Sequence, residues 1–369
     1  MSLLVVESDP EADSSIADLL KQLGYGSLSA ANLKTAVEMC DHARPELVIC
    51  QRLDWATALA AQYRYIPVAL ASADISQSLL LQALHAGVAD VWEFPPEAKQ
   101  FGELVGSVLE RSRKAARQAD QRLDQFVQDL ERDQRAGRYI QLGMLPPNPM
   151  AIDRYRLHHK IVPSLILSGD FVDYFRVSER YFVFYVADVS GHGASSAFVT
   201  VLLKNFSRRF RREYRPSMLV DPGEILEWLN RELLEQQIDK HVAMFIAVVD
   251  LEEDVVRFAN AGHFPPAILS SGGAARFLEL TGKPIGLFDF VSYEVGTTEL
   301  AMGDQLFVFS DGVIEVLPQG SLPEKEQTLL DAVNVSDTVD SVWKHLGLSM
   351  NETSEGPDDI TCLSVVRES

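Results

Sequence analysis

The sequence predicts an α/β domain with a doubly wound parallel sheet, then a long helical, coiled-coil-like linker, then an α+β sandwich flanked by helices. Three observations support this order in the 369-residue chain. Strand-like and amphipathic segments alternate over residues 1–96, which is typical of a parallel sheet with helical crossovers. Residues 97–145 are rich in charge and contain no proline. Residues 146–369 contain repeated apolar strand-like runs. We therefore expect three parts, 1–96, 97–145 and 146–369.

In the first part, residues 3–6, 47–50 and 67–71 are apolar and short enough to be buried strands. Helical periodicity separates them near residues 33–42 and 76–86. Residues 14–23 form a further amphipathic segment, because Ile16, Leu19, Leu20 and Leu23 fall on one helical face.

The linker carries small or apolar residues at alternating three- and four-residue steps, the spacing of a coiled-coil seam. The seam comprises Val105, Leu109, Ser112, Ala116, Ala119, Leu123, Phe126, Leu130, Asp133, Gly137, Ile140 and Met144, and it is weakened at Ser112, Asp133 and Gly137. Two interpretations remain open: a stalk that forms a homodimer, and a solvated spacer helix. The prolines at positions 146, 147 and 149 are expected to end the helix.

Composition excludes several classes of function. A formal net charge of -20 disfavours nucleic acid as the main partner, because the phosphate backbone needs a basic surface. Cys40, Cys50 and Cys362 are scattered without metal-ligand spacing, which fits a reducing compartment. We find no signal-peptide pattern and no run of eighteen apolar residues, so we expect a cytoplasmic protein that does not act at a membrane.

In the last part, strand-like runs at 181–187, 242–249, 255–259, 305–309 and 361–366 surround helical segments at 195–210 and 222–237. Asp221 is expected to cap the second helix, with Pro222 at its first position. Four aspartates lie beside such runs and next to or near glycines: Asp170, Asp188, Asp311 and Asp358. Carboxylates at strand ends can converge at one sheet edge, where they suit Mg²⁺ or Mn²⁺. Two such ions activate water and polarise a phosphoryl group, so the pattern favours a metal-dependent phosphatase.

These aspartates lie in four of five ordered motifs: 168–171 (SGDF), 188–193 (DVSGHG), 260–263 (NAGH, which has no aspartate), 310–313 (SDGV) and 358–361 (DDIT). Together they resemble the PPM-type metal-dependent serine/threonine phosphatases, most closely the bacterial branch that acts on sporulation and stress-response regulators. The resemblance implies that Asp188 bridges two Mn²⁺ or Mg²⁺ ions and that the Val189 carbonyl contacts one. It further implies that Asp170 helps to hold one ion, that Asp311 and Asp358 hold the other, and that a bridging hydroxide attacks phosphorus directly.

Other residues near these motifs are expected to play lesser parts. His192 and His263 are possible acids or bases, but a structural role in their turns is the favoured interpretation. Asp359 is expected to accept hydrogen bonds behind the metal ligands, and Asp173 is not needed to complete the site. Ser168 replaces a glycine that the family usually has, with little expected effect.

Residues 1–96 resemble the receiver domain of two-component response regulators, through residues 3–10, 45–50, 67–73 and 87–90. The phosphoacceptor position holds Gln51, an acidic position holds Ser8, and the lysine position holds Phe94. Only Glu7, Asp9 and Ser72 remain usable, and Asp54 is favoured as a surface carboxylate rather than a substitute phosphoacceptor. We therefore expect a degenerate receiver that binds an unidentified protein partner without being phosphorylated.

The family resemblance implies a phosphatase that acts on a small phosphorylated regulator of sigma-factor control, of the anti-sigma antagonist type. Two alternatives stay open at this point. One is a non-catalytic adaptor that binds a sigma-factor or anti-sigma partner through the phosphatase fold; retention of all four aspartates argues against it. The other is a hydrolase of small phosphoesters or nucleotides, for which we find no base- or sugar-binding motif.

Overall fold

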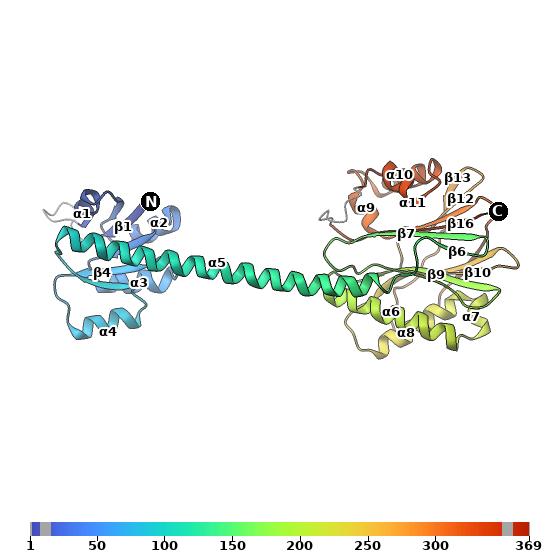
Figure 1. The fold of residues 1–369 in the computed structure, drawn as a ribbon, viewed down its shortest axis with the longest axis horizontal. Helices are drawn as coiled ribbons and strands as arrows, with labels where there is room; N and C mark the ends of the chain where they lie inside the picture. Colours follow the sequence, from blue (N-terminus) through green and yellow to red (C-terminus); the bar gives the residue numbers. More distant parts are fainter. Residues whose placement is uncertain (1, 8–15, 349–356, 369) are drawn as a thin grey trace. The chain divides into compact units, whose positions relative to one another are not determined.

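A computed structural model describes residues 2–7, 16–348 and 357–368. The chain divides into two compact units, residues 1–127 and 128–369, and helix α5 (Ala98–Leu142) contributes to both (Figure 1). Its extent agrees with the single long helix that the sequence predicts. None of the described helices is both long enough and apolar enough to cross a lipid bilayer.

The first unit contains a five-stranded parallel sheet in the order β2-β1-β3-β4-β5. Its elements are β1 Ser2–Val6, α1 Ile16–Gln22, β2 Gly26–Ala30, α2 Leu33–Ala43, β3 Leu47–Cys50, α3 Leu53–Gln62, β4 Val68–Ser72, α4 Gln77–His85 and β5 Asp90–Glu93. The predicted doubly wound α/β sheet is confirmed. Strands β2 and β5 are too polar to be recognised from their sequence alone.

Alternating residues of the strands supply two separate cores, one on each face of this sheet. Leu4 and Val6 face a core that includes Ala36 of α2 and Leu59 of α3. The opposite core includes Ile16 of α1, together with Phe101, Val105, Val108 and Leu109 from the start of α5. Val105 and Leu109 therefore pack on the sheet, although the sequence pattern placed them in the coiled-coil seam.

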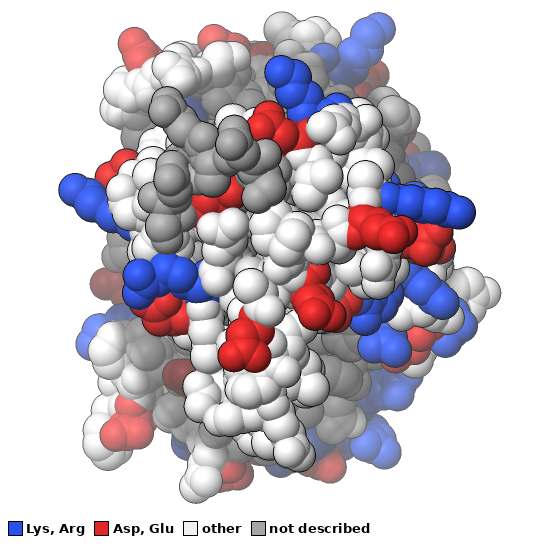
Figure 2. Space-filling model, turned by 90° about the vertical axis from the view of Figure 1, so that its left-hand side faces the viewer, with Lys and Arg blue, Asp and Glu red and all other residues white. Residues whose placement is uncertain are grey.

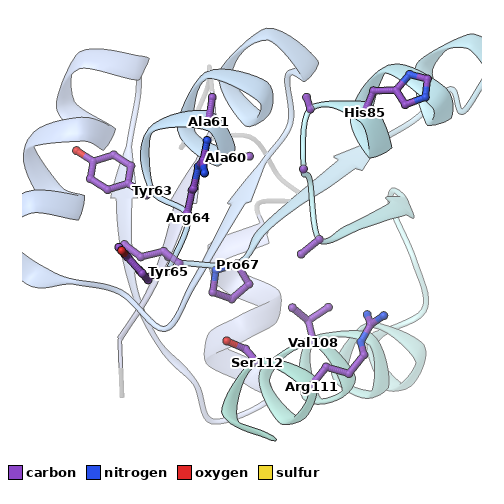
Figure 3. Close-up of a pocket in the computed structure, with 14 residues that line it drawn as sticks. Ala60, Ala61, Tyr63, Arg64, Tyr65, Pro67, His85, Val108, Arg111 and Ser112 are labelled. Carbon is purple, nitrogen blue, oxygen red and sulfur yellow. The ribbon is translucent and has the colours of Figure 1, made fainter. Parts of the chain in front are cut away.

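The surface of the first unit offers uncharged area and, among its hollows, one beside the α3–β4 connection. On the face drawn in Figure 2, uncharged side chains cover much of the middle, and Lys and Arg lie mostly toward the margin. The hollow measures about 760 Å³ and lies between the α3–β4 connection and α5, where Tyr63, Arg64 and Arg111 line it (Figure 3). No carboxylate lines it, so it is not a candidate metal site.

The second unit is a sandwich of two antiparallel sheets, in the orders β14-β11-β10-β9-β8 and β13-β12-β15-β16-β7-β6. The strands are β6 Met150–Ile152, β7 Tyr155–Val162, β8 Phe171–Arg176, β9 Tyr181–Val189, β10 Val242–Asp250, β11 Val255–Ala261, β12 Ile268–Ser271, β13 Ala274–Phe277, β14 Val295–Glu299, β15 Gln305–Phe309 and β16 Ile360–Arg367. The helices are α6 Ala194–Glu213, α7 Pro216–Val220, α8 Pro222–Glu235, α9 Gly312–Val316, α10 Leu322–Asn334 and α11 Val339–His345.

Three apolar layers hold this unit together. Val172 and Phe184 of one sheet meet Leu306 and Leu363 of the other in the central layer. Outside the first sheet, α6, α7 and α8 contribute side chains such as Leu203 to a second layer. Outside the other sheet, α9, α10 and α11 complete the third. The predicted helix-flanked sandwich is confirmed (Figure 1).

Candidate active site

The first pair of aspartates meets at one end of the β8–β9 ladder. In this antiparallel pair, Phe171 lies opposite Ala187. One step further along the same register, Asp170 lies opposite Asp188, because each residue advanced on one strand is matched by one on the other. Asp170 immediately precedes β8, and Asp188 is the second-last residue of β9.

The second pair comes from the other sheet. Phe309 of β15 pairs with Cys362 of β16, so the chain leaves β15 and enters β16 at the same edge. Asp311 follows β15 and Asp358 precedes β16. Ser310 joins the two connections, because its Oγ accepts a hydrogen bond from the Thr361 N–H at 2.8 Å and donates one to the Asp359 carbonyl at 3.2 Å.

The carboxylates of the two sheets lie close enough to influence one another. Burial raises the pKa of Asp188 to about 7, with further contributions from the charges of Asp311 and Asp358. The pKa of Asp170 is raised well above its ordinary value by burial and then by Asp188 and Asp359. Burial and the charge of Asp358 also raise the pKa of Asp311. Bound cations would relieve this concentration of negative charge.

The donor set fits hard divalent cations. Asp170 is 3% exposed, and its Oδ2 has no hydrogen-bond partner, which is costly for a buried carboxylate. Carboxylate oxygens are the ligands that Mg²⁺ and Mn²⁺ favour. Within the described ranges, however, no three acidic, histidine or cysteine side chains form a closed site around one point. The assignment of individual ligands therefore stays a prediction.

Gly169 brings the loop before Asp170 against the loop after Asp188. A Cβ atom at this position would lie 3.1 Å from the Val189 carbonyl oxygen and 3.3 Å from that of Gly191. A side chain at this position would force these carbonyls to move by a few tenths of an ångström, which glycine avoids. The backbone around the Val189 carbonyl, which the sequence marked as a possible ion ligand, is therefore part of the site.

Asp359 ties the last motif to the first. Its Oδ1 accepts hydrogen bonds from the N–H and hydroxyl of Ser164, at 2.6 and 2.8 Å. Its Oδ2 accepts from the Ser168 hydroxyl at 2.8 Å and from the Gly169 N–H at 2.6 Å. Asp359 therefore holds the loop that presents Asp170. Ser168 also accepts from the Asp170 N–H at 3.0 Å, so this serine has a defined place in the network.

Gln141, in the last turn of α5, makes hydrogen bonds near the site that the sequence did not predict. Its Nε2 donates to the Ser168 carbonyl at 2.7 Å and to Thr200 Oγ1 of α6 at 3.1 Å, and its Oε1 accepts from the Ser168 N–H at 3.2 Å. The side chain is 8% exposed. No sequence signal distinguishes it from other polar residues of the helix, because its role depends on where the helix ends against the sandwich.

Lys240 is a second residue that the sequence did not single out. Its Nζ donates to the Ser190 carbonyl at 2.7 Å and to Ser196 Oγ at 3.2 Å. Ser190 follows the Asp188–Val189 pair, and Ser196 lies in the first turn of α6. Lys240 therefore stabilises the turn between Asp188 and helix α6.

The two histidines differ. His192 is exposed in the loop before α6. His263 is buried, and burial lowers its pKa to about 4, so it is neutral near pH 7. Its ring nitrogens have no hydrogen-bond partner, and the turn is held instead by the Asn260 side chain, which bonds both the N–H and the carbonyl of His263. Asp173 pairs with Lys204 of α6 at 2.9 Å and is thereby engaged outside the aspartate cluster.

In the first unit, Gln51 lies beside Glu7, with Nε2 3.4 Å from Glu7 Oε2. Glu7 also accepts from the N–H of Ile16 at the start of α1. Asp54 is 60% exposed and forms an ion pair with Arg52 at 2.7 Å. Ser8 and Asp9 lie outside the described residues. The geometry around Gln51 offers an amide where a phosphoacceptor would need a carboxylate.

Comparison with known proteins agrees with the sandwich and its motifs. Residues 178–368 match the family model of stage II sporulation protein E. The chain belongs to this family. The match begins just after β8 and spans β9 to β16, so three of the four aspartates lie within it.

Two relatives from Bacillus subtilis (strain 168) each match about half of the chain. The phosphoserine phosphatase RsbP is 28% identical over 52% of this chain and 47% of its own length. The phosphoserine phosphatase RsbU is 27% identical over 50% of this chain and 53% of its own. The chain thus spans about half the length of these curated relatives.

Among solved structures, the SiaA-PP2C domain of Pseudomonas aeruginosa superimposes with a TM-score of 0.52. It is 19% identical and covers 65% of this chain and 96% of the solved chain. At this identity the likeness shows the fold alone, and it is the fold of a PP2C-type phosphatase domain.

Proposed function

We propose that this protein is a metal-dependent phosphatase of phosphoserine or phosphothreonine in a small bacterial regulatory protein. The observation that carries the proposal is the convergence of Asp170 and Asp188 from one sheet with Asp311 and Asp358 from the other. The raised pKa values of Asp170, Asp188 and Asp311 and the unpartnered Asp170 oxygen are the features expected of a cluster that binds cations.

In this proposal, Asp188 would help to hold both cations, Asp170 would help to hold one of them, and Asp311 and Asp358 would hold the other. Bound Mn²⁺ or Mg²⁺ would supply an activated water and offset charge on the phosphoryl group. Asp359 and Lys240 hold the loops that carry Asp170 and Asp188. His263, neutral and buried, takes no proton in the reaction.

The substrate and the regulation are proposed from the relatives and from the surface. The names of the two relatives support a phosphoserine substrate. The anti-sigma antagonist type is proposed from the family resemblance of the motifs. Exposed apolar side chains in the middle of α5 support a homodimer through the linker. The receiver-like domain, with Gln51 at the phosphoacceptor position, would bind a protein partner. In this proposal the receiver-like domain ends near residue 96, and the helical linker ends near residue 145.

Hydrolysis of p-nitrophenyl phosphate, with and without Mn²⁺, tests the activity. We expect metal-dependent turnover in the wild type and at least a hundredfold loss in Asp188→Asn, because a neutral amide bridges two cations poorly. An exposed substitution, Asp340→Asn, serves as the control and should retain full activity. Absence of metal-dependent turnover in the folded wild type would favour the adaptor instead.

A further inference from the structure

The exposed side of α6 changes character along its length. Phe198, Val201, Asn205, Arg208 and Arg212 follow one another at three- and four-residue steps, so they share one face of the helix. All five are exposed, while Val199, Leu203, Phe206 and Phe210 pack into the core. The half nearest the aspartates is apolar, and the far half is basic.

The basic half of α6 has a high density of positive charge, although the protein as a whole is acidic. Residues 204–215 include Lys204 and five arginines against a single acidic residue, Glu213, while the whole chain has a net charge of -20. We call Arg208, Arg211, Arg212 and Arg215 the α6 basic face; all four are exposed. Lys204 and Arg209 are excluded because Asp173, Glu213 and Glu232 neutralise them.

Little acidic charge neutralises the α6 basic face. Arg215 lies 3.5 Å from Glu224, and Arg211 lies over the Phe175 ring at 4.7 Å. For Arg208 and Arg212, no ion pair with a described carboxylate is recorded. These two are four residues apart, an arrangement in which like charges destabilise a helix.

Helix stabilisation explains only part of this pattern. Cations in the last turn interact favourably with the helix dipole, which accounts for Arg211 and Arg212. It does not account for Arg208, which precedes the last turn, or for Arg215, which follows the helix. The remaining charge is available for an acidic partner.

We infer that the α6 basic face is a docking surface for an acidic region of the phosphoprotein substrate. The inference rests on the proposed function and specifies its substrate class. Helix α6 starts directly after Gly193, and the Ser196 hydroxyl bonds the Ser190 carbonyl at 3.1 Å, so its first turn is fixed to the loop after Asp188. The helix therefore links the aspartates and the basic face rigidly.

The distance suits a small folded substrate. Arg208 lies fifteen residues beyond Gly193, which is about 22 Å along a helix at about 1.5 Å per residue. A globular domain of about 100 residues has a radius of gyration of about 13 Å and is therefore about 30 Å across. Such a protein can present a phosphoserine to the aspartates while its acidic surface contacts Arg208 and Arg212.

The test uses phosphoserine peptides that carry a tail of six Glu, six Gln or six Lys beyond a spacer of seven prolines. The spacer spans about 22 Å, because polyproline extends about 3.1 Å per residue. In the wild type at low salt, we expect kcat/KM to be at least fivefold higher for the Glu tail than for the Gln tail. The preference should shrink near 0.5 M salt, where charges are screened.

Variants then locate the effect. Arg208→Gln with Arg212→Gln should abolish the preference, and Arg208→Glu with Arg212→Glu should reverse it in favour of the Lys tail. The control for the second variant is Arg132→Glu with Arg135→Glu on α5. It makes the same change in net charge as Arg208→Glu with Arg212→Glu and should leave the preference for the Glu tail intact. Turnover of p-nitrophenyl phosphate should be equal in all of these proteins.

An equal preference in the wild type and the Arg208/Arg212 variants would overturn the inference. If even p-nitrophenyl phosphate is not hydrolysed, the proposed function fails, and fluorescence anisotropy with the same labelled peptides still tests the surface. Tighter binding of a single-stranded oligonucleotide than of the Glu-tailed peptide would assign the surface to nucleic acid and also overturn the inference.

Discussion

At the residue scale, the site gathers carboxylates that repel one another, and this has a cost in stability. The pKa of Asp188 rises to about 7 through burial and the nearby Asp311 and Asp358. In the unfolded chain, the same group has a pKa near 4. Between these values the folded state holds a proton that the unfolded state has lost, so stability falls as the pH rises.

This predicts a stability difference between the wild type and Asp188→Asn in metal-free protein. The variant should be more stable at pH 8, by up to about 4 kcal/mol, since each tenfold change in proton affinity is worth about 1.4 kcal/mol. The gap should close toward pH 4, where both states are protonated. Urea unfolding with chelator across this range measures it.

Added Mn²⁺ should reduce the difference in stability between Asp188→Asn and the wild type at pH 8. A cation that binds only the folded wild type raises the stability of the wild type alone. Equal stability of the two proteins at every pH, with and without Mn²⁺, would contradict the account of Asp188.

Asp359 makes a second prediction at this scale. Replacement by Ala leaves four donors from Ser164, Ser168 and Gly169 without their acceptor. We expect a loss of about 2–4 kcal/mol in unfolding free energy. The buried donors would have given up their hydrogen bonds to water without gaining a carboxylate acceptor in return. Mn²⁺-dependent turnover should also fall. Asp340→Ala, at an exposed carboxylate, is the control, and equal effects of the two changes would refute the role.

At the scale of elements, α5 combines three environments in one continuous helix. Its start packs against the parallel sheet through Phe101 and Val105. Its end bonds Ser168 through Gln141. Between them, Leu123, Phe126 and Leu130 are at least half exposed. Such a row of apolar side chains on a solvated helix is typical of an unpaired coiled-coil seam.

We therefore predict that Phe126→Glu with Leu130→Glu converts a dimer into a monomer, because buried like charges oppose association along the seam. Light scattering coupled to gel filtration measures the mass. Gln121→Glu with Gln128→Glu makes the same change in net charge on the same helix, away from the seam, and should remain dimeric. A wild type that is monomeric at all concentrations would favour the solvated spacer.

At the scale of the whole molecule, a receiver-like fold is joined to a phosphatase-like sandwich of the stage II sporulation protein E family. The first unit retains the five-stranded parallel sheet but not the chemistry of phosphorylation. Gln51 cannot form an acyl phosphate, and Asp54 is engaged by Arg52 at the surface. We therefore propose that this unit acts by binding a protein partner.

Incubation of the full chain with acetyl phosphate and Mg²⁺ should therefore give no stable adduct by intact-protein mass spectrometry. A receiver domain with an intact aspartate, treated in parallel, is the positive control. An adduct on the wild type that disappears in Asp54→Asn would show that Asp54 substitutes for the missing phosphoacceptor.

The sequence by itself determined the order of folds and the identity of the aspartates, because these depend on local patterns. Apolar runs, helical periodicity and aspartates beside glycines are readable within a few residues. Polar or mixed strands such as β2 and β7 were not predicted, since their place depends on the strands beside them.

Only the tertiary structure decided how these pieces work together. Registers in two separate sheets bring Asp170 to Asp188 and Asp311 to Asp358. Gln141 and Lys240 act through contacts with loops that are distant in sequence, so no local pattern marks them. The first turns of α5 pack against the apolar face of the parallel sheet and not against a second helix. A heptad pattern cannot reveal which of these two surfaces the apolar residues contact.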